Sequence, residues 1–494
     1  MKILLVNPAI PETFWSFRHA IKFVSKRSVF PPLGLLTVAA MLPPEWHKKF
    51  VDLNTADLSD TDLRWADYVF VGAMSVQAPS ARSIIARAHA VGRPIVAGGP
   101  LFSARPDEFP EVDHLVLNEA ELTLPPFLAD LARGTAQGVY RSTEWADVTT
   151  TPRPLWELVT MKHYSNMNVQ YSRGCPFDCE FCEITVLNGR KPRTKTAAQL
   201  LGEFDALADR GWKGEVFLVD DNFIGNRVKL KKEILPAMIA WRRGRKHPFL
   251  FNTEVSVDLA DDEEMMDLMV QAGFTTVFVG IESPHEQSLA ECKKIPNQRR
   301  DLLGSVRQLQ TRGLQVQGGF ILGFDSDPAS IFQRMVDFIQ ESGIVTAMVG
   351  LLNAPVGTRL YKRLHDEGRL LKTMSGDNTD FSMNFIPKMN LATLIDGYRH
   401  VLETIYTPKQ YYRRVMTFLR TYRPAPSGPM RLSRVHLQAF AKSIVLLGII
   451  GKERVQYWKQ IFWSLFTRPR TFPMAITLSI YGFHYRKILE QYVA

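Results

Sequence analysis

Short apolar runs alternate with amphipathic stretches over the first 135 residues, and this alternation constrains the fold more than any other feature. The apolar runs have the length and composition of buried strands: KILLVN, KFVDLN, DYVFVGAMS, PIVAGGP and HLVLNE. Between them, GLLTVAAML, SARSIIARAHAV and AELTLPPFLADLAR have the 3.6-residue spacing of helices. The pattern predicts parallel strands joined by right-handed crossovers, and hence a doubly wound, Rossmann-like α/β domain over residues 1–135.

The carboxyl ends of these strands are the expected ligand site, because open parallel sheets bind ligands at that edge. There the sequence has GAMSVQ, AGGP and LNEAE. The fingerprint G-x-G-x-x-G is absent after KILLVN, which argues against a dinucleotide. Taken alone, this front domain could bind a nucleotide, a flavin or nothing.

A second alternating array follows residues 136–166, whose mixture of Pro, Thr and charged residues predicts a linker. Six apolar runs, each followed by a helical stretch, occupy residues 167–370: NVQYSRG, EVFLVDDNF, FLFNTEVS, TTVFVGIES, VQGGFILGF and VTAMVGLLNAP. Six βα units fit a partial (β/α)6 barrel with catalytic groups at its strand ends. Residues 371–494 lack strand-like runs and are predicted to form a helical domain rich in basic and aromatic residues.

Three of the four cysteines lie within eight consecutive positions, directly after the first barrel strand. Cys175, Cys179 and Cys182 form C-x3-C-x2-C, and thiolates are the usual ligands of iron–sulfur clusters. A structural zinc site needs four ligands, and the fourth thiol, Cys292, lies 110 residues beyond Cys182 with no evident metal-binding partner beside it. Three thiolates on a four-iron cluster would leave one iron open to a substrate or cofactor. Zinc binding and a redox role are the alternatives.

This motif, with Phe181 before the last cysteine, resembles the signature of the radical S-adenosylmethionine (SAM) enzymes. The resemblance implies that the three cysteines hold a 4Fe–4S cluster, that SAM binds the open iron, and that cluster reduction releases a 5′-deoxyadenosyl radical. It also implies SAM-binding roles for residues beside the cluster and at the later strand ends: Phe181, Asp220, Asp221, Glu254, Glu282, Gly319 and Gly323. The alternatives are a structural turn for the two aspartates, a solvated strand end for Glu254 and strand bulges for the glycines.

Several residues that flank the cysteine motif are basic or aromatic: Tyr171, Arg173, Arg190, Lys191 and Arg193. Their side chains could pair with anionic groups of the substrate or with cofactor carboxylates. A basic, solvated loop is the alternative interpretation.

A doubly wound domain directly before such a core resembles the cobalamin-binding domain of cobalamin-dependent radical SAM enzymes. The resemblance implies cobalamin contacts from six residues: Leu33, Gly34, Ser75, Gly98, Gly99 and Glu119. Each could equally be a loop glycine or a helix cap. Two features depart from the family pattern. The motif D-x-H-x-x-G is absent, and NEAE (residues 118–121) stands where members tend to carry G-E-G-E, which leaves the role of Glu119 open.

The two cofactors together suit the transfer of a methyl group to a carbon that is not nucleophilic. The resemblance implies that one SAM methylates cobalt and that a second SAM yields the radical. We therefore expect a C-methyltransferase that acts on a hydrophobic substrate, a hopanoid-like lipid or a tetrapyrrole, because both ends of the chain resemble the branch of hopanoid C-2 methylases. An oxidase or cyclase without methyl transfer and a cobalamin-binding regulator are the alternatives. Flavodoxin or ferredoxin is the expected electron donor.

The positive charge of the chain is concentrated after residue 408. Residues 409–494 contain 15 Lys and Arg against two acidic residues, whereas the preceding residues sum to −3. Large aromatic residues lie among these basic ones, which suits an interfacial helix on anionic lipid. RNA binding and an ordinary helical core are the alternatives, although the family does not imply a nucleic acid. The few cysteines and the lack of a spanning apolar run indicate a cytoplasmic protein, with peripheral contact of residues 409–494 at the inner membrane face as a further hypothesis.

Overall fold

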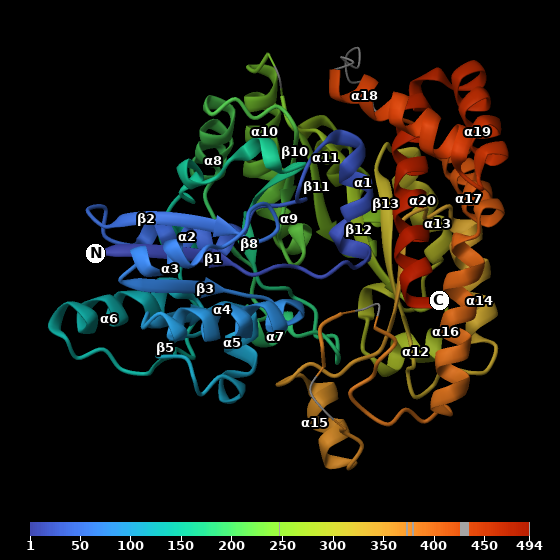
Figure 1. Ribbon diagram of the computed structural model, residues 1–494. Helices are drawn as coiled ribbons and strands as arrows, with labels where there is room; N and C mark the ends of the chain where they lie inside the picture. The colour runs from blue at the N-terminus through green and yellow to red at the C-terminus, as the bar shows by residue number, and fades with distance from the viewer. Residues whose placement is uncertain (247, 372–373, 378–379, 425–433, 494) are drawn as a thin grey trace.

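The computed structural model describes residues 1–246, 248–371, 374–377, 380–424 and 434–493. They form two six-stranded parallel sheets, one after the other along the chain, and a C-terminal helical region (Figure 1). The predicted α/β class and the order of a doubly wound domain, a partial barrel and a helical region are confirmed.

The front sheet has the strand order β2-β1-β3-β4-β5-β6, and all its strand pairs are parallel. Its strands are β1 (Lys2–Asn7), β2 (His47–Asp52), β3 (Tyr68–Gly72), β4 (Ile95–Gly98), β5 (His114–Val116) and β6 (Val139–Tyr140). The first five match the predicted runs. The sixth strand lies inside the predicted linker, where two residues are too few to show a strand pattern and where pairing with β5 fixes the conformation. The sheet therefore extends beyond residue 135.

Helices cover both faces of the front sheet, because successive strand residues point to opposite sides. Leu4 and Val6 belong to one apolar core, whereas Ile3 and Leu5 belong to another. The helices of this domain are α2 (Leu33–Met41), α3 (Asp60–Trp65), α4 (Ala78–Ala90), α5 (Pro100–Ala104) and α6 (Ala120–Arg133).

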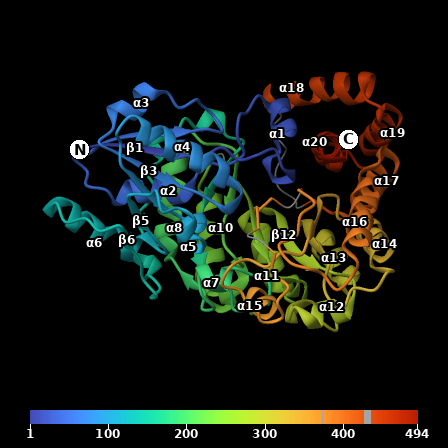
Figure 2. The same cartoon turned by 60° about the horizontal axis from the view of Figure 1, so that its bottom comes forward.

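A segment after β1 leaves the front domain and packs against the other end of the chain. It contains η1 (Phe14–Ser16), α1 (Arg18–Ile21) and η2 (Lys22–Val24), and its partner is the last helix, α20 (Phe472–Val493). The Nε2 atom of His484 lies 3.0 Å from the carbonyl oxygen of Phe14. Figures 1 and 2 show α1 beside α20 from two directions. We call residues 12–24 the front strap.

The second sheet is an open array of parallel strands in the order β14-β13-β12-β11-β10-β7, with β14 and β7 at its edges. Its strands are β7 (Asn166–Val169), β10 (Glu215–Leu218), β11 (Leu250–Val255), β12 (Phe274–Glu282), β13 (Gln315–Leu322) and β14 (Ala347–Leu351). Each lies within a predicted run or overlaps one. The predicted six-unit partial barrel is thus confirmed.

The barrel helices begin and end at residues that suit these positions. The Thr196 hydroxyl accepts a hydrogen bond of 3.2 Å from the Gln199 N–H, which caps α8, and α11 ends at Gly273 with φ +106°. The helices are α8 (Ala197–Asp209), α9 (Arg227–Lys229), the π-helical η9 (Leu230–Ile234), α10 (Leu235–Arg243), α11 (Glu263–Ala272), α12 (Glu286–Glu291), α13 (Leu302–Thr311), α14 (Ile331–Ser342) and α15 (Arg359–Asp366).

A short antiparallel hairpin follows the first barrel strand. It pairs β8 (Ser172–Arg173) with β9 (Arg193–Thr194), and the residues between them include α7 (Ile184–Leu187). We call residues 174–192 the cluster loop, because they contain the three clustered cysteines. The hairpin therefore fixes both ends of this loop at the edge of the barrel.

The C-terminal region consists of α16 (Leu391–Tyr406), α17 (Pro408–Thr421), α18 (Arg434–Ser443), the π-helical η12 (Ile444–Ile450), α19 (Arg454–Thr467), η13 (Pro469–Thr471) and α20. Its aromatic residues divide into two groups. Tyr411 and Phe418 are fully buried, as the core interpretation expects, whereas Phe462 and Phe466 are exposed. None of the described helices has the length and apolar content needed to pass through a bilayer.

Candidate functional site

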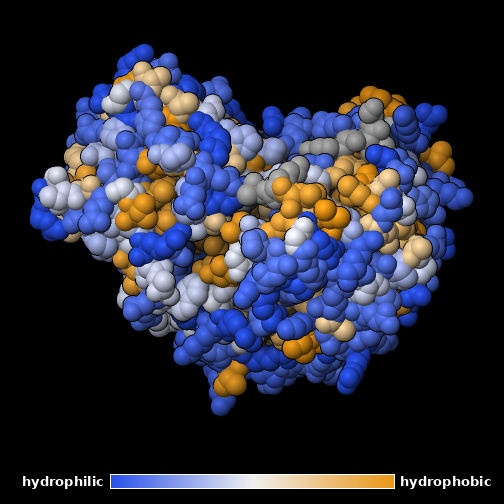
Figure 3. Space-filling view, turned by 90° about the horizontal axis from the view of Figure 1, so that it is seen from below, coloured by the Kyte–Doolittle hydropathy of each residue, from blue (hydrophilic) through white to orange (hydrophobic). Residues whose placement is uncertain are grey.

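A cavity of about 2340 Å³ lies between the front domain, the barrel and the C-terminal helices. Its wall includes all the residues predicted to contact cobalamin: Leu33, Gly34, Ser75, Gly98, Gly99 and Glu119. Seen from below, hydrophobic residues lie in the hollow between the two lobes of the molecule (Figure 3). The carboxyl ends of the front strands therefore face the barrel, which is the arrangement that two cooperating cofactors require.

The glycines of this wall bring bare backbone to the cavity. A Cβ atom on Gly98 would lie 2.6 Å from the carbonyl oxygen of Val116, and Gly99 has a φ of +90°, so neither position tolerates a side chain. A Cβ atom on Gly34 would meet nothing within 4 Å, so the cavity is open in front of this residue. These surroundings fit the close approach of a flat corrin ring, and the individual contacts remain predictions.

The cluster loop supplies three free thiols. Cys179 is buried, and Cys175 and Cys182 are half-buried. Burial raises the pKa of the Cys182 thiol to about 12, so this thiol is protonated in the metal-free chain and binding to iron would displace its proton. Within the described part of the chain, no three His, Cys, Asp or Glu side chains surround one metal-ion position. The donor set fits a cluster in which each thiolate binds its own iron.

The two aspartates after β10 hold the start of the cluster loop. The Asp220 carboxylate accepts a hydrogen bond from the Ser172 N–H, and the Asp221 carboxylate accepts one of 2.7 Å from the Gly174 N–H. Asn188, near the end of the loop, donates to Asp221 at 3.0 Å. Both aspartates thus act as the structural-turn alternative expects. A contact between either residue and SAM remains a prediction.

Glu254, at the end of β11, presents a carboxylate to the cavity. Among the residues predicted to bind SAM, only Asp221 and Glu254 line this cavity. Glu254 is half-buried, and within the described residues its side chain has no hydrogen-bond or ion-pair partner. Burial raises the pKa of Glu254 to about 7, and the nearby Asp221 acts in the same direction. A carboxylate held in this way is available to a ligand.

We expect Glu254→Gln to stabilise the metal-free protein at pH 8. Because the folded-state pKa of about 7 lies above the ordinary 4.5, the carboxyl group lowers stability progressively as the pH rises through this interval. The expected gain in unfolding free energy is about 1–3 kcal/mol at pH 8 and smaller at pH 5. Urea unfolding at both pH values measures it, with the exposed Glu264→Gln as control. A loss of stability at pH 8 would show that Glu254 has a stabilising partner.

Glu282 is part of a buried ion pair beside the cysteines. Its carboxylate lies 2.6 Å from Nζ of Lys294. Burial opposes the charge of Lys294, but Glu282 and the thiols of Cys179 and Cys182 raise the pKa of this lysine above its usual range. Lys294 therefore places a positive charge next to the cluster loop. The sequence pattern gave no signal for this residue, because it lies in an irregular turn after α12.

The remaining predicted SAM contacts lie behind the cavity wall. The ring of Phe181 packs against Phe324 with centroids 6.3 Å apart. A Cβ atom on Gly319 would lie 2.9 Å from the ring of Phe278, and Gly323 has a φ of +104°. These glycines are thus required by local packing and backbone conformation, and their contact with SAM remains a prediction.

Two arginines of the β8–β9 hairpin form ion pairs with the front domain. Arg173 lies 2.7 Å from Glu121 and 3.1 Å from Glu119, and Arg193 lies 2.8 Å from Glu119. Burial would raise the pKa of Glu121, but Arg173 outweighs it and lowers the pKa to about 2. We call these four residues the interdomain clamp. The Glu119 carboxylate is therefore engaged by arginines, and the two arginines pair with protein carboxylates instead of cofactor groups.

The other residues flanking the cysteine motif behave differently from the clamp. Tyr171 is buried, whereas Arg190 is exposed and lies 3.6 Å from Asp178. Lys191 is half-buried. The solvated-loop interpretation therefore fits Arg190 only.

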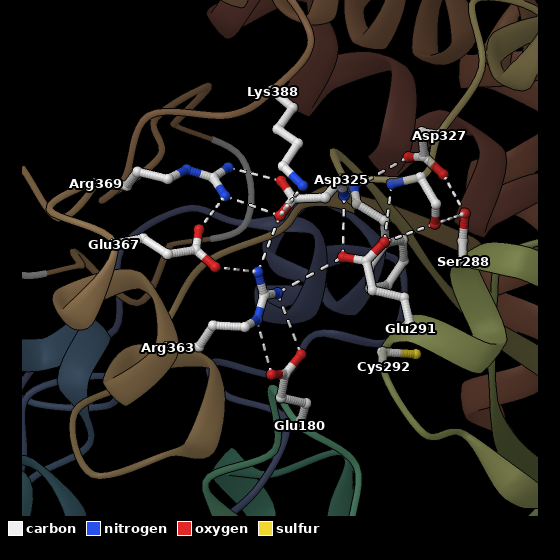
Figure 4. A network of polar contacts seen from close by, with 12 residues as sticks. Glu180, Ser288, Glu291, Cys292, Asp325, Asp327, Arg363, Glu367, Arg369 and Lys388 are labelled. Atoms are coloured by element: carbon white, nitrogen blue, oxygen red, sulfur yellow. Dashed lines mark hydrogen bonds and ion pairs between the residues drawn. The ribbon is translucent and has the colours of Figure 1, made fainter.

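A second ionic network fixes the cluster loop from the opposite side (Figure 4). Arg363 of α15 joins Glu180 in the cluster loop to Asp325, which follows β13, with both distances at 2.9 Å. Arg369 also pairs with Asp325, at 2.6 Å. The carboxylate of Glu291 accepts a hydrogen bond of 3.0 Å from the backbone N–H of Asp325. The position of the cluster loop thus depends on residues that follow the barrel.

Comparison with known proteins accounts for each part of the chain. Residues 23–128 match the B12 binding domain, residues 169–339 match the radical SAM superfamily, and residues 358–494 match a domain of unknown function (DUF4070). An uncharacterized methyltransferase of Synechocystis is 42% identical, with 99% of this chain and 93% of that protein aligned. The chain belongs to the cobalamin-dependent radical SAM methyltransferases.

Two further relatives of this methyltransferase have named substrates. The hopanoid C-2 methylase of Rhodopseudomonas palustris is 34% identical, with 93% of this chain and 88% of that protein aligned. The bacteriochlorophyllide d C-12(1)-methyltransferase of Chlorobaculum tepidum is 27% identical, with 70% and 76% aligned. Among solved structures, the methyltransferase TsrM of Kitasatospora setae, with cobalamin and a 4Fe–4S cluster bound, has a TM-score of 0.61 at 15% identity, covering 100% of both chains. This likeness shows the shared fold.

The methyltransferase accordingly uses SAM, a 4Fe–4S cluster and cobalamin. Its cavity lies where the front domain and the barrel meet, and the cluster loop lies at its edge, with Glu183 and Asn188 of that loop in the wall. The assignment of individual residues to each cofactor remains a prediction.

Proposed function

We propose that this methyltransferase adds a methyl group to an unactivated carbon of a hydrophobic substrate, a hopanoid-like lipid or a tetrapyrrole. The observation that carries the proposal is one large cavity, whose wall joins the predicted cobalamin residues to apolar side chains from all three parts of the chain. The hopanoid relative aligns with 93% of the chain and the bacteriochlorophyllide relative with 70%. A hopanoid-like lipid is therefore the favoured substrate.

Aromatic rings make up much of the apolar wall. Phe30 and Phe217 face each other with centroids 5.2 Å apart, and Trp15 and Phe278 pack at the same separation. Tyr481 of α20 also lines the cavity. Flat or fused-ring substrates gain the most from such surfaces, because the rings bury large areas with little loss of side-chain freedom.

The chain itself supplies binding, orientation and exclusion of water, while the bound cofactors supply the methyl group and the hydrogen-abstracting radical. We assign the cluster to the three cysteines and the corrin to the strand ends of the front domain. Asp221 and Glu254 are the predicted SAM contacts that face the cavity, so they are the groups we expect to orient SAM or a polar end of the substrate. The C-terminal helices close the cavity on the side away from the front sheet.

Anaerobic incubation of the reconstituted enzyme with deuteromethyl SAM and a hopanoid-like lipid tests the proposal. We expect 5′-deoxyadenosine together with a product that carries the labelled methyl group, both measured by mass spectrometry. Production of 5′-deoxyadenosine with an unlabelled, oxidised or cyclised product would favour the oxidase or cyclase alternative. Absence of SAM cleavage by enzyme with an intact cluster would favour the regulatory alternative.

The electron donor and the location of the enzyme belong to the same proposal. We propose a flavodoxin or ferredoxin as donor, a cytoplasmic enzyme, and a peripheral contact of residues 409–494 with the inner membrane face. The four free cysteines and the 15 basic residues of this region support the last two points. Reduction of the cluster by each donor protein, followed by electron paramagnetic resonance, tests the first.

A further inference from the structure

Exposed hydrophobic residues are concentrated on one part of the C-terminal region. Ten of the 21 large hydrophobic side chains that are exposed in the described chain lie between residues 435 and 466. Eight of them belong to η12, α19 and the turn between these two helices. We call these eight the apolar rim: Val445, Leu446, Ile449, Ile450, Val455, Phe462, Leu465 and Phe466. Monomeric proteins rarely expose so many apolar side chains together, so the rim indicates an interaction surface.

The rim has a regular origin in α19, which is apolar on two faces. Tyr457, Ile461 and Ser464 are buried against the rest of the region. On the opposite side, the rings of Trp458, Phe462 and Phe466 follow one another with centroids 5.3 and 6.4 Å apart, and Phe466 is 78% exposed. Because these three residues are four positions apart, they form one stripe along the helix.

The stripe of α19 continues onto η12. The Nε1 atom of Trp458 donates a hydrogen bond of 2.9 Å to the carbonyl oxygen of Gly448, which fixes the two helices against each other. Ile450, at the end of η12, is 68% exposed. The rim is therefore a continuous surface of two packed elements, and the part of the chain that the structure describes covers none of these eight side chains.

The exposed charges around the rim are positive. Lys452, Arg454, Lys459 and Arg470 are exposed. Glu453, the one acidic residue between 434 and 470, is buried and paired with Arg486. A partner for this surface must therefore combine an apolar interior with negative charge at its boundary, and a bilayer that contains anionic lipid has both.

The cavity opens beside the same surface. Val435 and Leu437 of α18 line the cavity and are 40% and 54% exposed. Arg470 and Phe472, which follow α19, also belong to the cavity wall. The helix α18 runs directly into η12, so the opening and the rim are neighbours in the chain as well as in space (Figure 1). An apolar molecule at the rim would thus reach the cavity without crossing water.

We propose that α18, η12 and α19 dock on the surface of an anionic bilayer and that the hydrophobic substrate passes from this bilayer into the cavity beside α18. The second part of the proposal rests on the proposed function, whereas the docking does not. A second copy of the chain is a poorer partner, because two-fold pairing of the rim would bring its positive charges together. A spanning mode does not fit either, since none of the described helices is long and apolar enough.

Vesicle binding of the reconstituted full-length enzyme tests the docking. We expect co-sedimentation with vesicles that contain 30% phosphatidylglycerol, weaker binding to pure phosphatidylcholine, and weakening by salt because exposed charges are screened. The double substitution Ile450→Glu with Phe466→Glu should reduce binding to the anionic vesicles at least tenfold. The triple substitution Lys452→Gln, Arg454→Gln and Lys459→Gln should reduce mainly the salt dependence.

A matched control carries the same chemical changes elsewhere. Val228 in α9 and Leu391 at the start of α16 are exposed hydrophobic residues outside the C-terminal rim, so Val228→Glu with Leu391→Glu should bind vesicles like the wild type. Circular dichroism and iron content of all variants verify that they fold. Equal vesicle binding by the rim variant and the control would overturn the proposal. So would a dimer that light scattering detects in the wild type and that the rim variant abolishes.

Product analysis separates the docking from the proposed function. The rim variant should methylate substrate dissolved in detergent at the wild-type rate, but it should methylate substrate embedded in vesicles at least tenfold more slowly. Equal rates on embedded substrate would overturn substrate delivery through the rim while leaving methylation intact. Vesicle binding without any methylated product would instead contradict the proposed function and leave the docking in place.

Discussion

Replacing Cys182 with alanine is expected to abolish SAM cleavage. The cluster loop offers three thiols, and loss of one leaves two ligands for a cluster that needs three protein thiolates to be held with one open iron. We expect the iron content to fall by more than half and the production of 5′-deoxyadenosine to drop below detection. Anaerobic purification, iron and sulfide analysis, and chromatography of the nucleoside product measure these effects.

Cys292→Ala is the matched control for this experiment. Cys292 is buried, and its backbone carbonyl accepts the N–H of Glu180 in the cluster loop, so its sulfur is the nearest candidate for a fourth ligand. We expect the alanine variant to keep its iron and its cleavage activity, because its side chain has only a weak sulfur contact with the Leu289 carbonyl oxygen at 3.6 Å. Loss of iron from both variants to the same extent would indicate a four-thiolate site and contradict the open iron.

Arg173→Met is expected to cause the largest loss of stability among single substitutions at the interdomain clamp. The change leaves the buried carboxylates of Glu119 and Glu121 without their shared partner, and removal of one member of a buried ion pair costs about 3–5 kcal/mol. The folded-state pKa of Glu121 is about 2, below its ordinary 4.5, so this contribution is fully present above pH 4.5 and disappears as the pH falls toward 2. Urea unfolding at pH 7 and pH 3.5 should therefore show a smaller difference at the lower pH.

Arg190→Met provides the comparison for the clamp. Arg190 lies in the same cluster loop, but it is exposed and its nearest carboxylate is 3.6 Å away, so its loss should cost less than about 1 kcal/mol. Cobalamin affinity gives a second measurement, because the clamp joins the wall of the predicted corrin site to the cluster hairpin. Similar losses for both arginines, or a loss for Arg173→Met that does not depend on pH, would contradict the buried clamp.

The sequence predicts the two sheets well, because a strand of four or more buried residues leaves an apolar run that repeats along the chain. Every predicted run of both arrays contains or overlaps a strand of the structure. β6 escapes the prediction, since Val139 and Tyr140 are too few to form a pattern and owe their conformation to a neighbouring strand. Local pattern thus specifies the elements, whereas partners far away in the chain decide where a sheet ends.

The candidate site is only partly readable from the sequence. The cysteine spacing identifies the cluster loop, since its ligands are close in the chain. The pairing of Arg173 with Glu121 and the position of Lys294 join segments that lie 52 or more residues from their partners. Spacing within one segment contains no information about such contacts. The same limit explains why basic and aromatic composition could not show which rings of the C-terminal region are buried and which belong to the apolar rim.

The front strap gives the chain an order of assembly. Residues 12–24 are among the first to leave the ribosome, yet His484 and Tyr485, against which Phe14 packs, are among the last. The strap must therefore wait for the whole of the barrel to be synthesised before it finds its place. Because it lies between β1 and β2, the doubly wound domain can complete its own sheet early, but its attachment to the remainder is made only when the final helix arrives. A ribosome stalled shortly before α20 would hold two finished lobes that are not yet fastened to each other along this seam.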